Sequence, residues 1–146
     1  WSLIAGNETR DGIGGSGHVT VAEFADYRLD SEGVSLGFFN RVELSYARQA
    51  LNTKGIGAAL GLGYGYQLNQ DIYGAKLRIA GDLVYGGEYR TKPDNLAIAR
   101  EDDWYDLFAA FAINRNLTVA AAYANIGSVA TSKEQHGGLL SLRASF

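Results

Sequence analysis

The residues of this chain that could take part in acid–base chemistry are two histidines and a run of acidic side chains. Glu101, Asp102 and Asp103 are consecutive, and the histidines are His18 and His136. Carboxylates beside a histidine can hold a divalent cation or act as a general acid and base in hydrolysis. The two histidines do not have the fixed spacing of metal ligands. We therefore expect solvated loop residues, with a hydrolytic site or a cation site as alternatives.

Other chemical sites find little support in the composition. The chain has no cysteine, which excludes disulfides, thiolate metal sites and thiol nucleophiles. The segment GLGYGYQL is rich in glycine but lacks the Lys-Ser/Thr pair of a phosphate-binding loop. The net charge of −3 gives no basic field for nucleic acid. We expect no enzyme activity, no metal, no cofactor and no nucleic-acid partner.

The elements that must position these residues are predicted to be β-strands, because apolar and polar residues alternate along much of the chain. Glycine occurs 19 times and proline once, which favours strands joined by tight turns. A length of 146 residues predicts one domain, residues 1–146. The eight expected strands are residues 1–10, 28–39, 41–50, 71–85, 88–93, 103–113, 117–126 and 137–146.

The connections between these strands alternate in length. Long segments follow the first, third, fifth and seventh strands, and short turns, such as Phe39-Asn40 and Gly86-Gly87, follow the others. In an up-and-down meander this order puts the long loops at one end and the tight turns at the other. Outer-membrane barrels have this asymmetry. The sequence therefore predicts an antiparallel, up-and-down transmembrane β-barrel of eight strands, whose last strand pairs with the first.

The choice between a membrane barrel and a soluble barrel depends on strand length. No run of 18 or more apolar residues is present, so we expect no transmembrane helix. The stretch from Tyr73 to Tyr85 would extend for about 40 Å as a strand. Soluble strands usually have about 5–6 residues, so this length favours a strand that crosses a bilayer at a tilt. A soluble, lipocalin-like barrel with its apolar face inside is the alternative.

In a transmembrane barrel the polar faces of the strands point inward and the apolar faces point to lipid. Charges of both signs on the polar faces favour a paired network that fills an eight-stranded barrel, and hence a structural or surface role. A porin-like channel and an enzyme sited at the rim are the alternatives. The expected interior network is Glu43, Lys76, Arg78, Asp82, Asp106 and Arg143. The expected lipid-facing aromatic girdle is Tyr46, Tyr73, Tyr85, Tyr105, Phe111, Tyr123 and Phe146.

The two ends of the sequence carry expectations of their own. Trp1 follows no basic leader region, so we expect a mature chain without its signal peptide. The final segment GGLLSLRASF alternates as a closing strand. Leu140, Leu142 and Phe146 would face lipid, with the terminal aromatic at the interface.

Several segments resemble an uncharacterised proteobacterial outer-membrane family, the domain of unknown function 3034. They are NRVELSYARQALNTKGIGAALGLGYGY, QDIYGAKLRIAGDLVY, EYRTKPDNLAIAREDDWYD and LSLRASF. The resemblance implies a Gram-negative outer-membrane β-barrel in contact with outer-membrane lipids and lipopolysaccharide, and it supplies no catalytic residues. It also implies that the barrel-assembly machinery reads the terminal Leu140, Leu142 and Phe146.

The resemblance also implies a difference in length. Family members have more strands between the segments that resemble GDLVY and EYRTKPDNL, which Gly86 and Gly87 join here. Either an even number of strands has been lost, or the barrel has further strands and is wide enough to conduct.

Overall fold

The computed structural model describes residues 12–59, 61–80, 82–92, 102–129 and 132–144. These residues form eight antiparallel strands in one sheet, and each strand pairs with its neighbours in the sequence. The predicted all-β, up-and-down fold of eight strands is therefore confirmed. The strands are β1 (Ile13–Glu23), β2 (Arg28–Phe38), β3 (Val42–Asn52), β4 (Gln67–Ala80), β5 (Leu83–Thr91), β6 (Trp104–Asn114), β7 (Leu117–Val129) and β8 (Ser132–Ala144).

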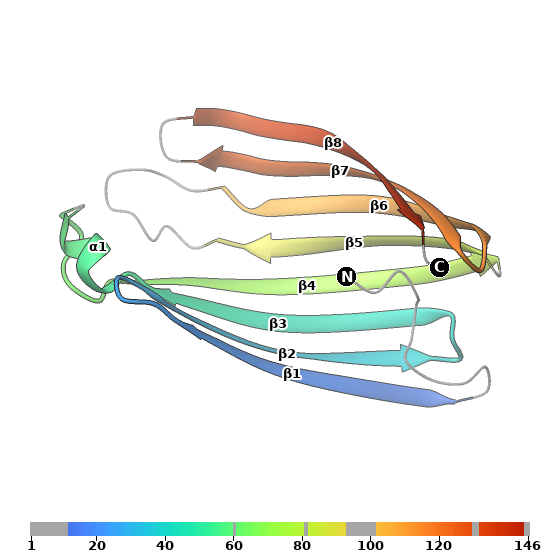
Figure 1. Ribbon diagram of the computed structural model, residues 1–146, viewed down its shortest axis with the longest axis horizontal. Coiled ribbons are helices and arrows are strands. Elements are labelled where there is room, and N and C mark those ends of the chain that lie inside the picture. The colour runs from blue at the N-terminus through green and yellow to red at the C-terminus, as the bar shows by residue number, and fades with distance from the viewer. Residues whose placement is uncertain (1–11, 60, 81, 93–101, 130–131, 145–146) are drawn as a thin grey trace.

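The described strands form a curved trough in which β1 and β8 are the edge strands. Figure 1 shows β1 along one edge and β8 along the other, well apart from each other. The strand order runs from β1 to β8, and no pairing joins these two strands. We expected the last strand to pair with residues 1–10, but those residues lie outside the described part of the chain. The described sheet is thus open, although its strand order is the order of a barrel.

The prediction of one long strand over residues 71–85 was wrong. β4 ends at Ala80 and β5 begins at Leu83, and the two strands pair as an antiparallel hairpin. The predicted Gly86-Gly87 turn lies inside β5, where these glycines pair with Lys76 and Ala75. The alternation did not reveal the turn, because partners across this hairpin, such as Leu77 and Tyr85, are both odd-numbered. Next to the turn, the odd-numbered residues are therefore apolar in both strands, and the alternation gives no sign of the turn between them.

The first strand of the sheet lies where we expected a long loop. β1 carries three glycines in the segment IGGSGHVTVAE, and they obscure the alternation. It pairs along its whole length with β2, from Ile13 opposite Phe38 to Glu23 opposite Arg28. Because pairing with a neighbour can outweigh the low strand propensity of glycine, the partner strand explains why this segment is extended.

The connections only partly follow the predicted alternation of lengths. The turn at Phe39-Asn40 is confirmed, since both residues have positive φ and the Arg41 N–H donates to the Phe38 carbonyl over 2.9 Å. The β6–β7 turn is confirmed at residues 115–116. The long segment expected over residues 11–27 instead contains β1, which leaves only residues 24–27 between β1 and β2. The long segment expected before the last strand is wrong as well, because β7 extends to Val129 and β8 begins at Ser132.

The long connections that remain lie at the same end of the sheet. Residues 53–66 join β3 to β4 and include the short helix α1 (Lys54–Ala59), and residues 92–103 join β5 to β6. Figure 1 shows α1 at one end of the trough, opposite the end that carries the tight turns. We call these the loop end and the turn end. Within the described residues, no helix is long and apolar enough to cross a membrane.

Candidate functional site

The inner face of the trough carries the charged side chains of β3 to β6. Glu43 on β3 is 5% exposed, and its carboxylate accepts a hydrogen bond of 2.5 Å from the ammonium group of Lys76 on β4. The two residues are direct partners in the β3–β4 register. Opposite charges that lie directly across two strands attract each other, and Glu43 is buried, so this pair is the best defined ion pair of the inner face.

A second charged group lies one strand further along the sheet. The guanidinium group of Arg90 donates to the carboxylate of Glu88 over 2.9 Å, and both residues are on β5. Glu88 is the register partner of Asp106 on β6, which places two carboxylates side by side. Glu88 and Arg90 were not predicted for the interior network, because the misplaced turn put them in a short strand of their own.

Some polar atoms on the inner face make no hydrogen bond to the described residues although they are buried. They are Gln70 Nε2, Arg78 Nε, Trp104 Nε1 and Asp106 Oδ1. Buried polar groups normally have a hydrogen-bonding partner. These groups all point into the trough from β4 and β6, so the trough is where such partners must lie.

The other two residues of the expected interior network are placed differently. Asp82 lies in the β4–β5 turn and is exposed, so it is not part of the inner face. Arg143 shares the inner face of β8 with Ser141, but it is exposed because β8 is an edge strand. The described structure therefore brings together Glu43 with Lys76, and Glu88 with Arg90 and Asp106, and it leaves Asp82 and Arg143 apart.

A small apolar cluster lies beside these charges, towards the turn end. Val84, Phe108, Ala110 and Ala120 are the buried apolar residues of the described part of the chain. The Phe108 ring covers Gly86, because a Cβ atom added at Gly86 would lie 2.4 Å from Cζ of the ring. This glycine therefore allows the ring to lie flat against β5.

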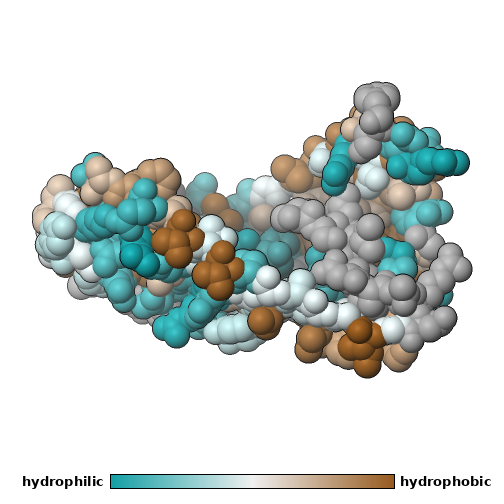
Figure 2. All heavy atoms as spheres, turned by 60° about the horizontal axis from the view of Figure 1, so that its bottom comes forward, coloured by the Kyte–Doolittle hydropathy of each residue, from teal (hydrophilic) through white to brown (hydrophobic). Residues whose placement is uncertain are grey.

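The outer face of the sheet is apolar and exposed. Leu44, Leu77, Leu107, Leu140 and Leu142 are between 47% and 79% exposed, and apolar side chains are visible on the surface in Figure 2. The residues between them on the strands, such as Glu43 and Lys76, face inward. This arrangement is the reverse of the soluble pattern, in which the apolar side of a sheet is covered.

A row of tyrosines crosses the outer face of β3 to β6. Tyr46 is the register partner of Tyr73, Tyr73 of Tyr89, and Tyr89 of Tyr105. The Tyr46 and Tyr73 rings are 5.3 Å apart, and Tyr123 on β7 extends the row at 6.4 Å from Tyr105. Tyr85 and Phe111 lie on the same face nearer the turn end, and Phe146 is outside the described residues. Tyr89 was not predicted for the girdle, although it lies on the same face of β5 as Tyr85.

The outer face changes in polarity at this tyrosine row. On the turn-end side it carries Leu44, Leu77 and Leu107, and on the loop-end side it carries charged residues. The Tyr46 hydroxyl donates to Asp71 over 2.9 Å, and the Tyr89 hydroxyl donates to Asp103. Tyrosine rings with an apolar body and a polar tip suit a boundary of this kind.

The charged residues nearest the loop end pair with one another. Arg28 is the first residue of β2. Its guanidinium group donates to the Asp30 carboxylate through Nε, which is shared between both oxygens, and through Nη2, over 2.8–3.0 Å. This bonding raises the pKa of Arg28 above its usual value. Lys54 of α1 donates to Glu23 and to the Phe24 carbonyl, which fastens α1 to the β1–β2 turn.

The acidic run at the loop end has structural contacts, and both histidines lie in strands. The Asp102 carboxylate accepts the Ser128 N–H over 3.0 Å, and the Asp103 carboxylate accepts the Lys92 N–H over 2.9 Å. Glu101 lies outside the described residues.

The prediction that both histidines occupy loops was wrong. His18 lies on β1 over Gly33, and the His136 ring lies on β8, 6.2 Å from Tyr123.

These acidic residues and histidines do not form a metal site in the described structure. Within the described ranges, no group of three or more His, Asp or Glu residues is arranged to hold a metal ion. The Asp102 and Asp103 carboxylates instead fix the backbone at the ends of β5 and β7. Their contacts thus give the acidic run a structural role at the loop end.

Comparison with known proteins finds one family. A family model described as a protein of unknown function, DUF3034, matches residues 1–87 and 83–143. The two matched stretches meet in β5, the strand that contains Gly86 and Gly87. A search of curated proteins and a search of solved structures found no match.

Proposed function

Because the chain belongs to the DUF3034 family, whose description gives no activity, we propose a function from the two faces of its sheet. The protein is an integral β-barrel of the bacterial outer membrane, with a mainly structural or surface role. It is not an enzyme, and its partners are outer-membrane lipids, lipopolysaccharide and, during biogenesis, the barrel-assembly machinery. The observation that carries this proposal is the exposed apolar outer face, bounded by the tyrosine row.

The apolar side chains of the outer face need an apolar environment to cover them. Leaving a Leu or Phe side chain in water instead of an apolar environment costs about 1.5–3 kcal/mol. The outer face exposes many such side chains, whereas the described residues bury four apolar ones. Soluble monomers rarely expose an apolar area of this extent, and a lipid environment removes the cost.

The backbone gives a second argument for closure. Among the described strands, β1 and β8 each pair on one side alone, and unpaired N–H and C=O groups are costly in lipid. Closing the sheet would put β5 opposite β1 and β6 opposite β2. Glu88 and Phe108 would then lie opposite the inner face of β1 and β2, which carries small residues such as Ser16, Gly33 and Ser35. Large side chains opposite small ones fill the interior of an eight-stranded barrel, so the closed barrel would be plugged.

The membrane proposal is tested by the mobility of the folded protein on a detergent gel. A barrel that stays folded in detergent migrates differently before and after boiling. We expect two mobilities. We also expect the protein to stay in the membrane fraction until detergent extracts it. A monomer that remains in solution without detergent, with a single mobility, would contradict the proposal.

A porin-like channel is the second candidate, and the open sheet favours it. If β1 and β8 pair with additional strands instead of each other, the interior becomes wider than side chains can fill. The family match in two stretches that meet in β5 fits such a wider barrel. Conductance in a planar bilayer separates the candidates. We expect no steady current from the plugged barrel, and a steady current would favour the channel.

A further inference from the structure

Two adjoining hollows lie on the outer face of β1 to β4, where the polarity of that face changes. The first has a volume of about 350 Å³, and most of the residues that line it are polar, among them Glu32, Arg48 and Asn69. The second has a volume of about 550 Å³ and is lined by Gly17, Val34 and Tyr46, among others. Val19 and Glu32 line both hollows. A polar hollow therefore continues into a more apolar one, in the direction of the apolar outer face.

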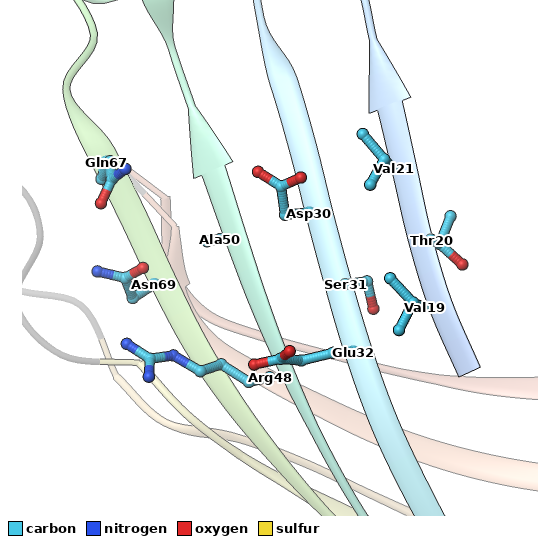
Figure 3. A pocket seen from close by; sticks show the side chains of 10 residues that line it. All are labelled: Val19, Thr20, Val21, Asp30, Ser31, Glu32, Arg48, Ala50, Gln67 and Asn69. Carbon is cyan, nitrogen blue, oxygen red and sulfur yellow. The ribbon is translucent and has the colours of Figure 1, made fainter. Parts of the chain in front are cut away.

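The polar hollow holds one cationic and one anionic side chain that make no hydrogen bond or ion pair within the described residues, although Arg48 acts electrostatically on Tyr46. Arg48 and Glu32 are register partners on β3 and β2, yet neither makes a hydrogen bond or ion pair with a described residue. Figure 3 shows the Arg48 guanidinium extended towards β4 and away from the Glu32 carboxylate. Asp30 accepts from Arg28, and Asp71, the register partner of Arg48 on β4, accepts the Tyr46 hydroxyl and makes no ion pair with Arg48. A ligand with one negative and one positive group would complement this pair.

The apolar hollow exists because Gly17 has no side chain. Gly17 pairs with Val34, and Val34 pairs with Tyr46, so these three residues form one row of the outer face. A Cβ atom added at Gly17 would meet a single atom, the Gly33 carbonyl oxygen at 3.7 Å, which is an ordinary contact. Neither the space around the backbone nor its conformation therefore demands a glycine here. The recess leaves room for an alkyl chain to lie against the sheet.

We propose that these hollows bind one phospholipid with a zwitterionic headgroup, a phosphate and an ammonium group. Arg48 donates to the phosphate, Glu32 accepts from the ammonium, and one acyl chain lies over Gly17 towards the apolar outer face. A headgroup with several phosphates fits less well, because Glu32 and Asp30 bring negative charge to the hollow. This inference rests on the proposed membrane location, and it specifies a lipid site there.

Native mass spectrometry of the full chain in mild detergent tests the proposal. The probes are phosphatidylethanolamine, phosphatidylglycerol, and lipid A with Mg²⁺, at equal concentrations. We expect one phosphatidylethanolamine to be retained in preference to the other two. Arg48→Gln and Glu32→Gln should each weaken its retention about tenfold, since each removes a charge-assisted hydrogen bond. Gly17→Leu should weaken retention of all chain-bearing lipids at this site by filling the recess.

Matched controls make these variants specific. Arg115→Gln removes the same charge in the β6–β7 turn, and Gly138→Leu adds the same side chain to the outer face of the other edge strand. A Cβ atom at Gly138 would have one contact, at 3.8 Å, so this substitution is as easily accommodated as the one at Gly17. Both controls should retain phosphatidylethanolamine as the unmodified protein does.

The proposal is overturned if lipid A with Mg²⁺ is preferred, if Arg48→Gln retains phosphatidylethanolamine undiminished, or if Gly138→Leu weakens retention as much as Gly17→Leu. If the charge variants do not fold, the lipid preference of the unmodified protein and the Gly17→Leu variant decide the matter. Gel mobility is read on the same samples. Two mobilities without lipid selectivity reject the lipid site alone, and selectivity with a single mobility rejects the barrel alone.

Discussion

At the scale of single residues, the inner face depends on the pairing of its charges. The side chains of Glu43 and Lys76 are 6% and 18% exposed, so their ion pair is largely removed from water. The Arg28–Asp30 pair at the loop end is 45% and 44% exposed. Water screens the second pair far more than the first, and the two should therefore differ in what their loss costs.

We predict that Glu43→Ala lowers the free energy of unfolding by about 3 kcal/mol, because it leaves the Lys76 ammonium buried without its partner. Urea unfolding in detergent micelles, followed by tryptophan fluorescence, measures this change. The Glu43→Gln/Lys76→Gln double variant should recover part of the loss, since neither charge then remains.

The exposed pair supplies the control for this prediction. Asp30→Asn should lower the free energy of unfolding far less than Glu43→Ala does, because exposed ion pairs contribute little. If Glu43→Ala were no more costly than Asp30→Asn, the Glu43–Lys76 pair would not stabilise the inner face.

At the scale of elements, β5 shows how a sequence pattern can predict the right face and the wrong turn. Tyr85 and Tyr89 lie on the outer face as their phase indicates, although the turn was expected between them. Gly86 and Gly87 are in the strand because their neighbours approach closely. A Cβ atom at Gly87 would lie 2.8 Å from the Asp106 carbonyl oxygen. The glycines of β5 thus serve packing and not a turn.

We predict that Gly86→Val lowers stability by about 1–3 kcal/mol, because its side chain would overlap the Phe108 ring. Combining it with Phe108→Ala should restore part of this loss, with a coupling energy of about 0.5–3 kcal/mol for residues in contact. Urea unfolding of the two single variants and the double variant measures the coupling. Purely additive effects would show that Phe108 does not pack on Gly86.

At the scale of the whole molecule, the open question is what the edges of the sheet pair with. The chain contains no cysteine, so an introduced pair reports on a single contact. Three partners are possible for β1: β8 of the same chain, β8 of a second copy, or another strand. The proposed plugged barrel requires the first.

We predict that Val19→Cys on β1, combined in turn with Gly138→Cys, Leu140→Cys or Leu142→Cys on β8, forms an intramolecular disulfide in at least one pairing in membranes. Cysteine pairs bridge only when their Cα atoms are within about 7 Å, so the successful pair also gives the register of closure. Non-reducing gels distinguish a cross-linked monomer from a dimer. A dimer would indicate a barrel of two chains, and no cross-link at any pairing would indicate intervening strands.

The sequence by itself determined the strand type and the face on which most side chains lie, because alternation with a period of two is a local property of the chain. It placed Glu43 and Lys76 on one face and Tyr46 and Tyr73 on the other. It could not locate β1, because pairing with β2 makes this glycine-rich segment extended. It could not locate the β4–β5 turn either, because the alternation of apolar and polar residues is the same on both sides of that turn. Only the tertiary structure brought Arg48 beside Glu32, placed Tyr89 in the tyrosine row and opened the recess at Gly17, because these relations depend on the register between strands.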